Sequence, residues 1–152
     1  MEKATHKNRE ILFYGRRRKY GFLSNMYLCP IKIDGVTYKS VEHYYQSRKA
    51  KKSEIRVWIA SAPLAFFAFS SGRSLREKDM VKNWEGRKLK VMRKALYAKF
   101  TQNKELRKKL IKTADAVLHE NSPTDLFWGM RGKDYLGKEL MCLRERLMRE
   151  GF

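Results

Sequence analysis

A predicted β-hairpin that leads directly into a helix constrains this chain more than any other stretch. Two short runs with alternating apolar residues, 31–33 and 36–38, flank the pair Asp34-Gly35. Because Asp-Gly tolerates the positive φ angles of a type I′ turn, this pattern predicts a hairpin. Ser40 follows at once with the chemistry of a helix N-cap. The chain therefore combines strands and helices within one short unit.

The helix that begins after Ser40 carries an unusual polar face. Glu42 lies in its first turn, where a negative charge suits the helix dipole. Steps of three, four and seven residues lead from Glu42 to Tyr45, Gln46 and Lys49, and we expect the helical pattern to continue beyond Lys49. A helix packed only for stability would carry leucines on this face. If the face is buried, it indicates a chemical role.

The remaining pattern predicts a single compact, mainly helical α+β domain with a few short strands. We expect residues 1–10 to be a flexible N-terminus and residues 11–152 to form the domain. Ser53 is expected to cap the second helix, Asn83 to cap the long one, and Phe66, Phe67 and Phe69 to lie in the core. The predicted strands are 11–14 and 116–119, and the predicted helices are 53–60, 64–71 after Pro63, 84–100, 106–111 and a last one marked by Leu136, Leu140, Leu143 and Leu147.

The formal net charge of +19 is the strongest anomaly of composition. It points to a polyanionic partner or a phosphorylated small molecule, although a solvated basic surface explains it equally well. No apolar run is long enough to span a membrane and the N-terminus lacks a signal-peptide pattern, so we expect a cytoplasmic protein. Without an export signal, Cys29 and Cys142 are expected to be reduced packing residues rather than a disulfide.

Motifs for bound cofactors are missing. There is no GxGxxG, no GxxxxGK[ST] and no GxSxG. His6, His43 and His119 lie far apart without ligand spacing, so we expect neither a metal nor a cofactor. His43 points a quarter-turn away from Glu42, and we interpret it as a packing histidine.

Several short motifs, in one order along the chain, resemble the NADAR domain family, also called YbiA-like. They span nearly everything from Ile11 onward and are specific only in combination. They are Phe22-Leu23-Ser24-Asn25, residues 33–38, residues 40–46 with Lys49, Asn83-Trp84, Val91-Met92 with Lys99-Phe100, Asp125 with Phe127-Trp128-Gly129, and Leu136-Gly137 with Leu140-Met141 and Leu143-Arg144.

The resemblance implies an N-glycosidase that breaks a ribose C1–N bond in a phosphorylated substrate. Family members cleave ribosylamino-pyrimidine intermediates of riboflavin synthesis or remove ADP-ribose from guanine bases in nucleic acid. Such cleavage develops positive, oxocarbenium-like charge on the sugar, which a carboxylate stabilises. By the resemblance Glu42 is the catalytic carboxylate, with Lys49 and Asp125 as partners. For Lys49 a Schiff-base nucleophile, a phosphate ligand and a surface lysine remain open, and for Asp125 a water-polarising or ribose-binding role and a simple cap.

Further residues are candidates for binding the substrate that the resemblance implies. Ser24 and Asn25 are candidates for the ribose or a phosphate, Arg73 and Arg131 for phosphates, and Trp84 and Trp128 for stacking on the base, with core packing as the alternative for the tryptophans. The full set of substrate-binding candidates is Ser24, Asn25, Tyr45, Gln46, Arg73, Trp84, Trp128, Gly129 and Arg131.

Some positions depart from the family pattern, and an alternative function remains. Asp134 stands where an Asn is usual, Ala114 stands where many members have Gly, and the loop after Trp128-Gly129 is short and basic. These departures leave the choice of substrate open. The alternative is a nucleic-acid-binding protein on the same scaffold with little or no catalysis. The sequence does not determine an oligomeric state.

Overall fold

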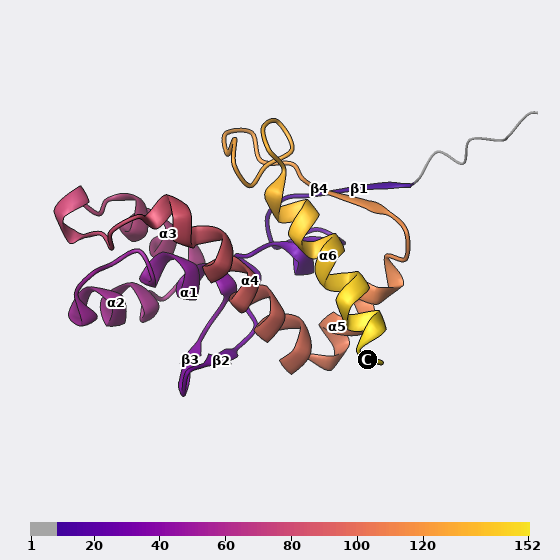
Figure 1. The fold of residues 1–152 in the computed structure, drawn as a ribbon, viewed down its shortest axis with the longest axis horizontal. Helices are drawn as coiled ribbons and strands as arrows, with labels where there is room; N and C mark the ends of the chain where they lie inside the picture. The colour runs from indigo at the N-terminus through magenta and orange to yellow at the C-terminus, as the bar shows by residue number, and fades with distance from the viewer. Residues whose placement is uncertain (1–8) are drawn as a thin grey trace, which may run out of the picture.

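The computed structural model describes residues 9–152, and within them the fold is the expected mainly helical α+β domain (Figure 1). The expected flexible N-terminus falls outside the described residues up to residue 8, and Arg9 and Glu10 lie beside another strand. The strands are β1 (Glu10–Phe13), β2 (Ile31–Ile33), β3 (Val36–Tyr38) and β4 (Val117–Glu120). The helices are α1 (Val41–Ser47), α2 (Ser53–Ala60), α3 (Ala65–Arg73), α4 (Trp84–Gln102), α5 (Lys104–Lys112) and α6 (Tyr135–Arg149).

The predicted hairpin is confirmed in its turn as well as its strands. β2 and β3 pair antiparallel, with Ile33 opposite Val36. Asp34 and Gly35 both have positive φ angles, 50° and 81°, as a type I′ turn requires. The other sheet is a parallel pair, in which Ile11 of β1 lies opposite Leu118 of β4. This pairing joins two segments that are more than a hundred residues apart in the sequence.

Helix α1 lies at the centre of the helical part of the fold. It packs against α2, α3, α4 and β3, and Figure 1 shows α2 and α3 grouped around it while α6 lies over β4 at the other side. Every residue of α1 is buried. A polar helix face in such a position has no solvent to satisfy it and must find partners within the protein.

Several local predictions need correction. α1 ends at Ser47, so Lys49 lies in the turn that follows and not on the helix. Ser53 is the first residue of α2 rather than its cap, which is Lys52 without a side-chain hydrogen bond. Asn83 does cap α4, because its side-chain oxygen accepts from the amide of Gly86 at 3.3 Å.

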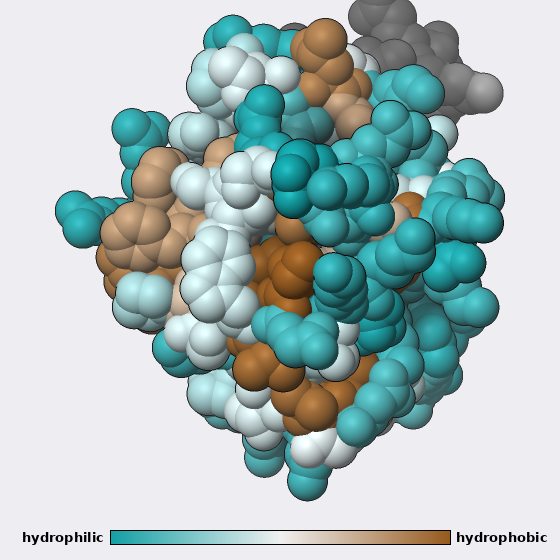
Figure 2. Space-filling view, turned by 90° about the vertical axis from the view of Figure 1, so that its left-hand side faces the viewer, coloured by the Kyte–Doolittle hydropathy of each residue, from teal (hydrophilic) through white to brown (hydrophobic). Residues whose placement is uncertain are grey.

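The phenylalanines of α3 do not form the core. Phe66 and Phe67 are 59% and 48% exposed, and Phe69 is half-buried. The face of α3 that turns inward carries Ala65, Ala68 and Gly72, because small residues allow close approach to α1. Figure 2, which looks onto the α2–α3 end of the molecule, shows apolar surface exposed among polar side chains.

Cysteine and histidine were predicted partly correctly. Cys29 is buried and Cys142 is exposed, so Cys142 is not a packing residue, and both are free. The ring of His43 is fully buried and lies 2.7 Å from the Ser40 hydroxyl and 3.0 Å from the Ala62 carbonyl oxygen, which confirms a packing histidine. Within residues 9–152 no helix is long and apolar enough to cross a bilayer, and no group of three or more metal-ligating side chains gathers.

Candidate active site

The site is built around Glu42. Two contacts fix its backbone: the Ser40 cap of α1 and a hydrogen bond to the loop before the hairpin. Ser40 caps α1, its hydroxyl accepting from the amide of His43 at 3.3 Å, and this fixes the first turn. The amide of Glu42 donates to the carbonyl oxygen of Asn25 at 3.0 Å, so the loop before the hairpin closes over the helix start. The Glu42 side chain is 7% exposed.

Among the described residues, one hydrogen bond reaches the Glu42 carboxyl group. The Gln46 amide nitrogen, one turn along α1, donates to Oε1 at 2.6 Å. Burial raises the pKa of Glu42, while the hydrogen bond from Gln46 and the charge of Lys49 lower it and the charge of Asp125 raises it. The pKa of Glu42 is raised overall, because removing a carboxylate from water costs more free energy than these partners contribute.

Lys49 reaches the same site from the turn after α1. Its amine lies 5.4 Å from the centre of the Tyr45 ring, and its backbone carbonyl oxygen accepts from the amide of Val81 at 2.9 Å. Burial lowers the pKa of Lys49, Glu42 opposes this shift, and the cations Arg73 and Lys88 add to it. The effect of burial on the pKa of Lys49 is therefore larger than the opposing effect of Glu42, and the amine releases its proton more readily than an ordinary lysine.

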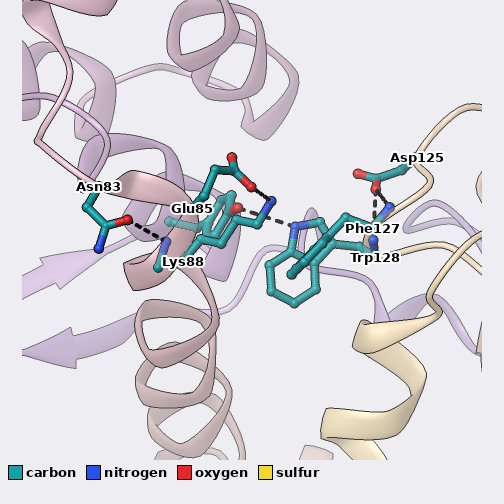
Figure 3. A network of polar contacts seen from close by, with 8 residues as sticks. Asn83, Glu85, Lys88, Asp125, Phe127 and Trp128 are labelled. Atoms are coloured by element: carbon teal, nitrogen blue, oxygen red, sulfur yellow. Dashed lines mark hydrogen bonds and ion pairs between the residues drawn. The ribbon is translucent and has the colours of Figure 1, made fainter.

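Three aromatic side chains form one wall of the site. The Tyr45 ring meets the rings of Trp84 and Trp128 edge-on, with centroids 5.2 and 5.7 Å apart. The indole nitrogen of Trp128 donates to the Tyr45 hydroxyl at 3.3 Å, a contact drawn in Figure 3. Because both tryptophans are buried, they hold Tyr45 in place whether or not they also contact a base.

Asp125 serves as a cap and also lies beside the other carboxylates. Its Oδ1 accepts from the amides of Phe127 at 2.9 Å and Trp128 at 2.8 Å (Figure 3). Oδ2 takes no hydrogen bond from the residues that the structure describes. The charge of Asp125 contributes to raising the pKa of Glu42, so the two carboxyl groups are neighbours.

Two buried amide oxygens of the site have no partner. They are Oδ1 of Asn25 and Oε1 of Gln46, each without a hydrogen bond within residues 9–152. Buried acceptors of this kind are uncommon in folded proteins and call for a donor. Hydroxyl groups of a sugar are donors of suitable chemistry. Ser24 is engaged already, since its hydroxyl accepts from the amide of Met26 at 3.2 Å.

The basic candidates differ in their placement. Arg73 is exposed at the end of α3, and its charge acts on Lys49. Arg131 is also exposed and turns to its own loop, with a contact of 3.4 Å to the carbonyl oxygen of Pro123. Lys88 of α4, which was not among the predicted residues, lies 3.6 Å from the centre of the Phe127 ring and pairs with Glu85 (Figure 3). Helical spacing from Trp84 was the available signal for Lys88.

Glu120 is a further carboxyl group that sequence reasoning missed. It ends β4, and burial together with the charge of Asp125 raises its pKa to about 7. Its Oε2 accepts from the amide of Ser122 at 3.2 Å. Gly129 packs close by: a β-carbon there would lie 3.0 Å from Oε2 and would overlap the Asp125 carbonyl oxygen. The site thus contains three neighbouring carboxyl groups and an amine of lowered pKa.

Comparison with known proteins first gives the class of enzyme. The chain is 44% identical over 141 residues to N-glycosidase YbiA of Escherichia coli (strain K12), covering 90% of this chain and 88% of the relative. It is 37% identical over 144 residues to an N-glycosidase of Nostoc punctiforme, covering 90% and 92%. The chain is therefore a hydrolase that acts on N-glycosyl bonds.

The family follows from the domain match and the fold. Residues 12–148 match the NADAR domain. The NMR structure of the E. coli protein YbiA superposes with a TM-score of 0.86 at 43% identity, covering 94% of this chain and 87% of that one. The chain belongs to the NADAR family, as its motifs predicted. A riboflavin biosynthesis protein of Vibrio vulnificus is 36% identical over 90% of this chain, which spans 38% of that protein.

Proposed function

We propose that this N-glycosidase cleaves the C1–N bond of a phosphorylated ribosyl compound, with Glu42 as its catalytic carboxyl group. The observation that carries this assignment is the environment of Glu42: a buried carboxyl group that receives a hydrogen bond from Gln46 and has Lys49 and Asp125 as charged neighbours. A carboxyl group so placed can act on the sugar during cleavage, either as a carboxylate beside the developing positive charge or as a proton donor.

Two chemical routes use the same residues in different protonation states. In the first, the C1–N bond breaks heterolytically, ionised Glu42 stabilises the cationic sugar, and water adds to C1 while one of its protons passes to the departing nitrogen. In the second, protonated Glu42 gives its proton to the ring oxygen and the sugar opens to an iminium ion. The neutral Lys49 amine then adds at C1, the substrate's nitrogen leaves as an amine, and water hydrolyses the lysine imine.

The second route is the one that we infer. Its two requirements are a protonated carboxyl group and a neutral amine. The raised pKa of Glu42 and the lowered pKa of Lys49 both favour that pair of protonation states.

The replacements Glu42→Gln and Lys49→Met test these roles. We expect Glu42→Gln to lower kcat by about 10²–10⁴-fold, the usual contribution of a general acid or base, with an unchanged circular dichroism spectrum. Borohydride added during turnover should reduce the imine and leave a sugar adduct on the wild-type protein, located at Lys49 by mass spectrometry and absent from Lys49→Met. A wild-type protein without an adduct at full activity would exclude the second route, and full activity of Glu42→Gln would exclude the assignment of Glu42.

Two classes of substrate fit this chemistry. The riboflavin biosynthesis protein among the relatives favours phosphorylated ribosylamino-pyrimidines. The net charge of +19 favours ADP-ribose attached to a base in nucleic acid. Hydrolysis of both substrates by one preparation, compared as kcat/KM, decides between them. We place the enzyme in the cytoplasm, where the free Cys29 and Cys142 would stay reduced.

A further inference from the structure

A hollow outside the Glu42 site has a chemistry that the proposed hydrolysis does not use. Its volume is about 300 Å³, and it is lined by residues 14–18, Met26 and residues 64–66. The loop after β1 thus faces the beginning of α3. Arg17 and Arg18 on the loop wall and Leu64 and Phe66 on the helix wall are exposed.

The loop wall is strongly basic. Arg16, Arg17, Arg18 and Lys19 follow one another, and none of them forms an ion pair with a carboxylate within residues 9–152. The loop is nevertheless held in place: the amide of Gly21 donates to the Arg18 carbonyl oxygen at 2.8 Å, and a β-carbon at Gly21 would overlap the backbone of Arg16. A positioned cluster of uncompensated cations suits a chain of phosphates.

Each wall offers one exposed aromatic ring. Tyr14, at the start of the basic loop, is 53% exposed, and Phe66 on α3 is 59% exposed. An exposed ring beside guanidinium groups is the arrangement on which unpaired bases stack while their phosphates are neutralised. Bases in a duplex are already stacked and paired, so this combination fits a single strand better than a double one.

The hollow is connected to the candidate active site by two short routes. Met26 comes directly after Asn25, whose carbonyl oxygen receives the amide of Glu42. α3 leads from the hollow at Ala65 to Gly72, which packs on the side chain of Gln46. At 1.5 Å per residue, this path along α3 is only about 10 Å long. A strand bound in the hollow would therefore lie within one or two nucleotide lengths of the site.

We propose that this hollow binds a single-stranded segment of nucleic acid, with phosphates on Arg16, Arg17 and Arg18 and a base stacked on Phe66 or Tyr14. The inference rests on the proposed function in one respect, since it selects the nucleic-acid-linked substrate over the free metabolite. It names the surface that would hold the strand on which such a substrate is carried.

Binding by the full chain tests the proposal directly. The probe is a fluorescently labelled oligothymidylate, measured by anisotropy at several salt concentrations. The variant Arg16→Gln/Arg17→Gln/Arg18→Gln is compared with Lys90→Gln/Lys104→Gln/Lys112→Gln, which removes the same charge from exposed positions of α4 and α5. We expect the arginine variant to bind at least about tenfold more weakly and to flatten the salt slope by about 2, at roughly 0.7 for each phosphate that is no longer neutralised. The lysine variant should bind nearly as tightly as the wild type.

The aromatic part has a matched control on the same helix. Phe66→Ala should weaken binding several-fold without changing the salt slope, because stacking releases no counterions. Phe67→Ala removes a neighbouring ring that is also exposed but does not line the hollow, and it should leave affinity unchanged. Thermal unfolding of each variant checks that the fold is retained.

Three results would overturn the proposal: equal losses of affinity in both charge variants, tighter binding to the matching duplex, or preferential binding to vesicles of anionic phospholipid. Failure of the proposed function has a different signature. Suppose that the arginine variant loses strand binding and that the wild-type protein hydrolyses neither substrate class. The proposed binding surface is then supported and the proposed hydrolysis is refuted. If a free phosphorylated ribosylamine is hydrolysed and no strand binds, the proposed hydrolysis is supported and the proposed binding surface is refuted.

Discussion

Lys99 is a residue whose environment decides its behaviour. Its side chain is fully buried within α4, and its amine donates to the carbonyl oxygen of Ser24 at 2.9 Å. Burial lowers its pKa from the ordinary 10.5 to about 8, opposed only by the nearby thiol of Cys29. The amine holds the Ser24-Asn25 loop, which in turn receives the amide of Glu42. Lys99 thus supports the loop that holds the start of α1 at the candidate site.

The lowered pKa of Lys99 predicts that the folded protein becomes more stable at alkaline pH. Between about pH 8 and pH 10.5 the unfolded chain holds this proton while the folded chain has released it, so the free energy of unfolding increases with pH across that window. The full effect of such a pKa difference is roughly 3 kcal/mol. In Lys99→Met this rise should be clearly smaller, because only other lysines of lowered pKa such as Lys49 still contribute, while Lys90→Met, on an exposed face of the same helix, should keep it in full. Urea unfolding from pH 7 to 10 measures both, and parallel curves for wild type and Lys99→Met would contradict the prediction.

Ala114 is strained for a residue with a β-carbon. It follows the end of α5 with a φ angle of +53°, in the left-handed region that favours glycine. A left-handed conformation costs an alanine about 1 kcal/mol relative to glycine, which is why helices so often end on Gly. Ala114→Gly should therefore raise the free energy of unfolding by up to about 1 kcal/mol. Ala60→Gly, inside the last turn of α2, should lower it by a similar amount, and destabilisation by both replacements would refute the explanation.

At the scale of elements, the contact between α1 and α3 sets the geometry of the site. α3 turns its small residues inward, and Gly72 lies so close to α1 that a β-carbon would overlap the Gln46 amide oxygen. Gln46 is buried and donates to Glu42, so it has little freedom to yield. The absence of a side chain at position 72 therefore keeps the carboxyl group and its donor in register.

Gly72→Ala tests this contact. Alanine favours helix by up to about 1 kcal/mol over glycine, so a position with free space would gain stability. Here we expect kcat to fall by about tenfold as Gln46 moves away from Glu42, with little or no gain in stability. Ser70→Ala, at an exposed position of α3, is the control and should leave kcat unchanged. Full activity together with increased stability of Gly72→Ala would show that the Gln46 side chain can move aside without loss of stability or activity.

At the scale of the whole molecule, the charge of +19 acts against the fold that carries it. The described ion pairs join side chains that are at least partly exposed, and such pairs contribute little. The excess cations repel one another over distances comparable to the size of the domain. This repulsion is the cost of a surface suited to phosphates.

Salt should therefore stabilise this protein. Raising sodium chloride from about 10 mM to about 150 mM shortens the screening length from roughly 30 Å to roughly 8 Å, which weakens repulsion among the cations more than it weakens short ion pairs. The unfolding temperature should rise by several degrees, as followed by circular dichroism. A fall would mean that the ion pairs outweigh the repulsion. The arginine variant (Arg16→Gln/Arg17→Gln/Arg18→Gln), with three fewer cations, should show a smaller rise in unfolding temperature.

The local structure was largely predictable because it depends on neighbours in the sequence. The Asp34-Gly35 turn and the Asn83 cap follow from backbone angles and hydrogen bonds that span a few residues. The last helix follows from its leucine spacing. The motif set also identified the family, and it named Glu42, Lys49, Trp84 and Asp125 as candidates.

Burial and protonation were not predictable, because they depend on contacts between distant segments. The exposure of Phe66 and Phe67 follows from the small residues with which α3 meets α1. The sequence by itself determined the elements, the family and the type of chemistry. Only the tertiary structure decided that Glu120 joins the carboxyl group of Asp125, that Lys99 is enclosed, and that burial outweighs Glu42 in setting the pKa of Lys49. Desolvation is the physical reason, since its cost is set by everything that surrounds a charge and not by the residues beside it in the chain.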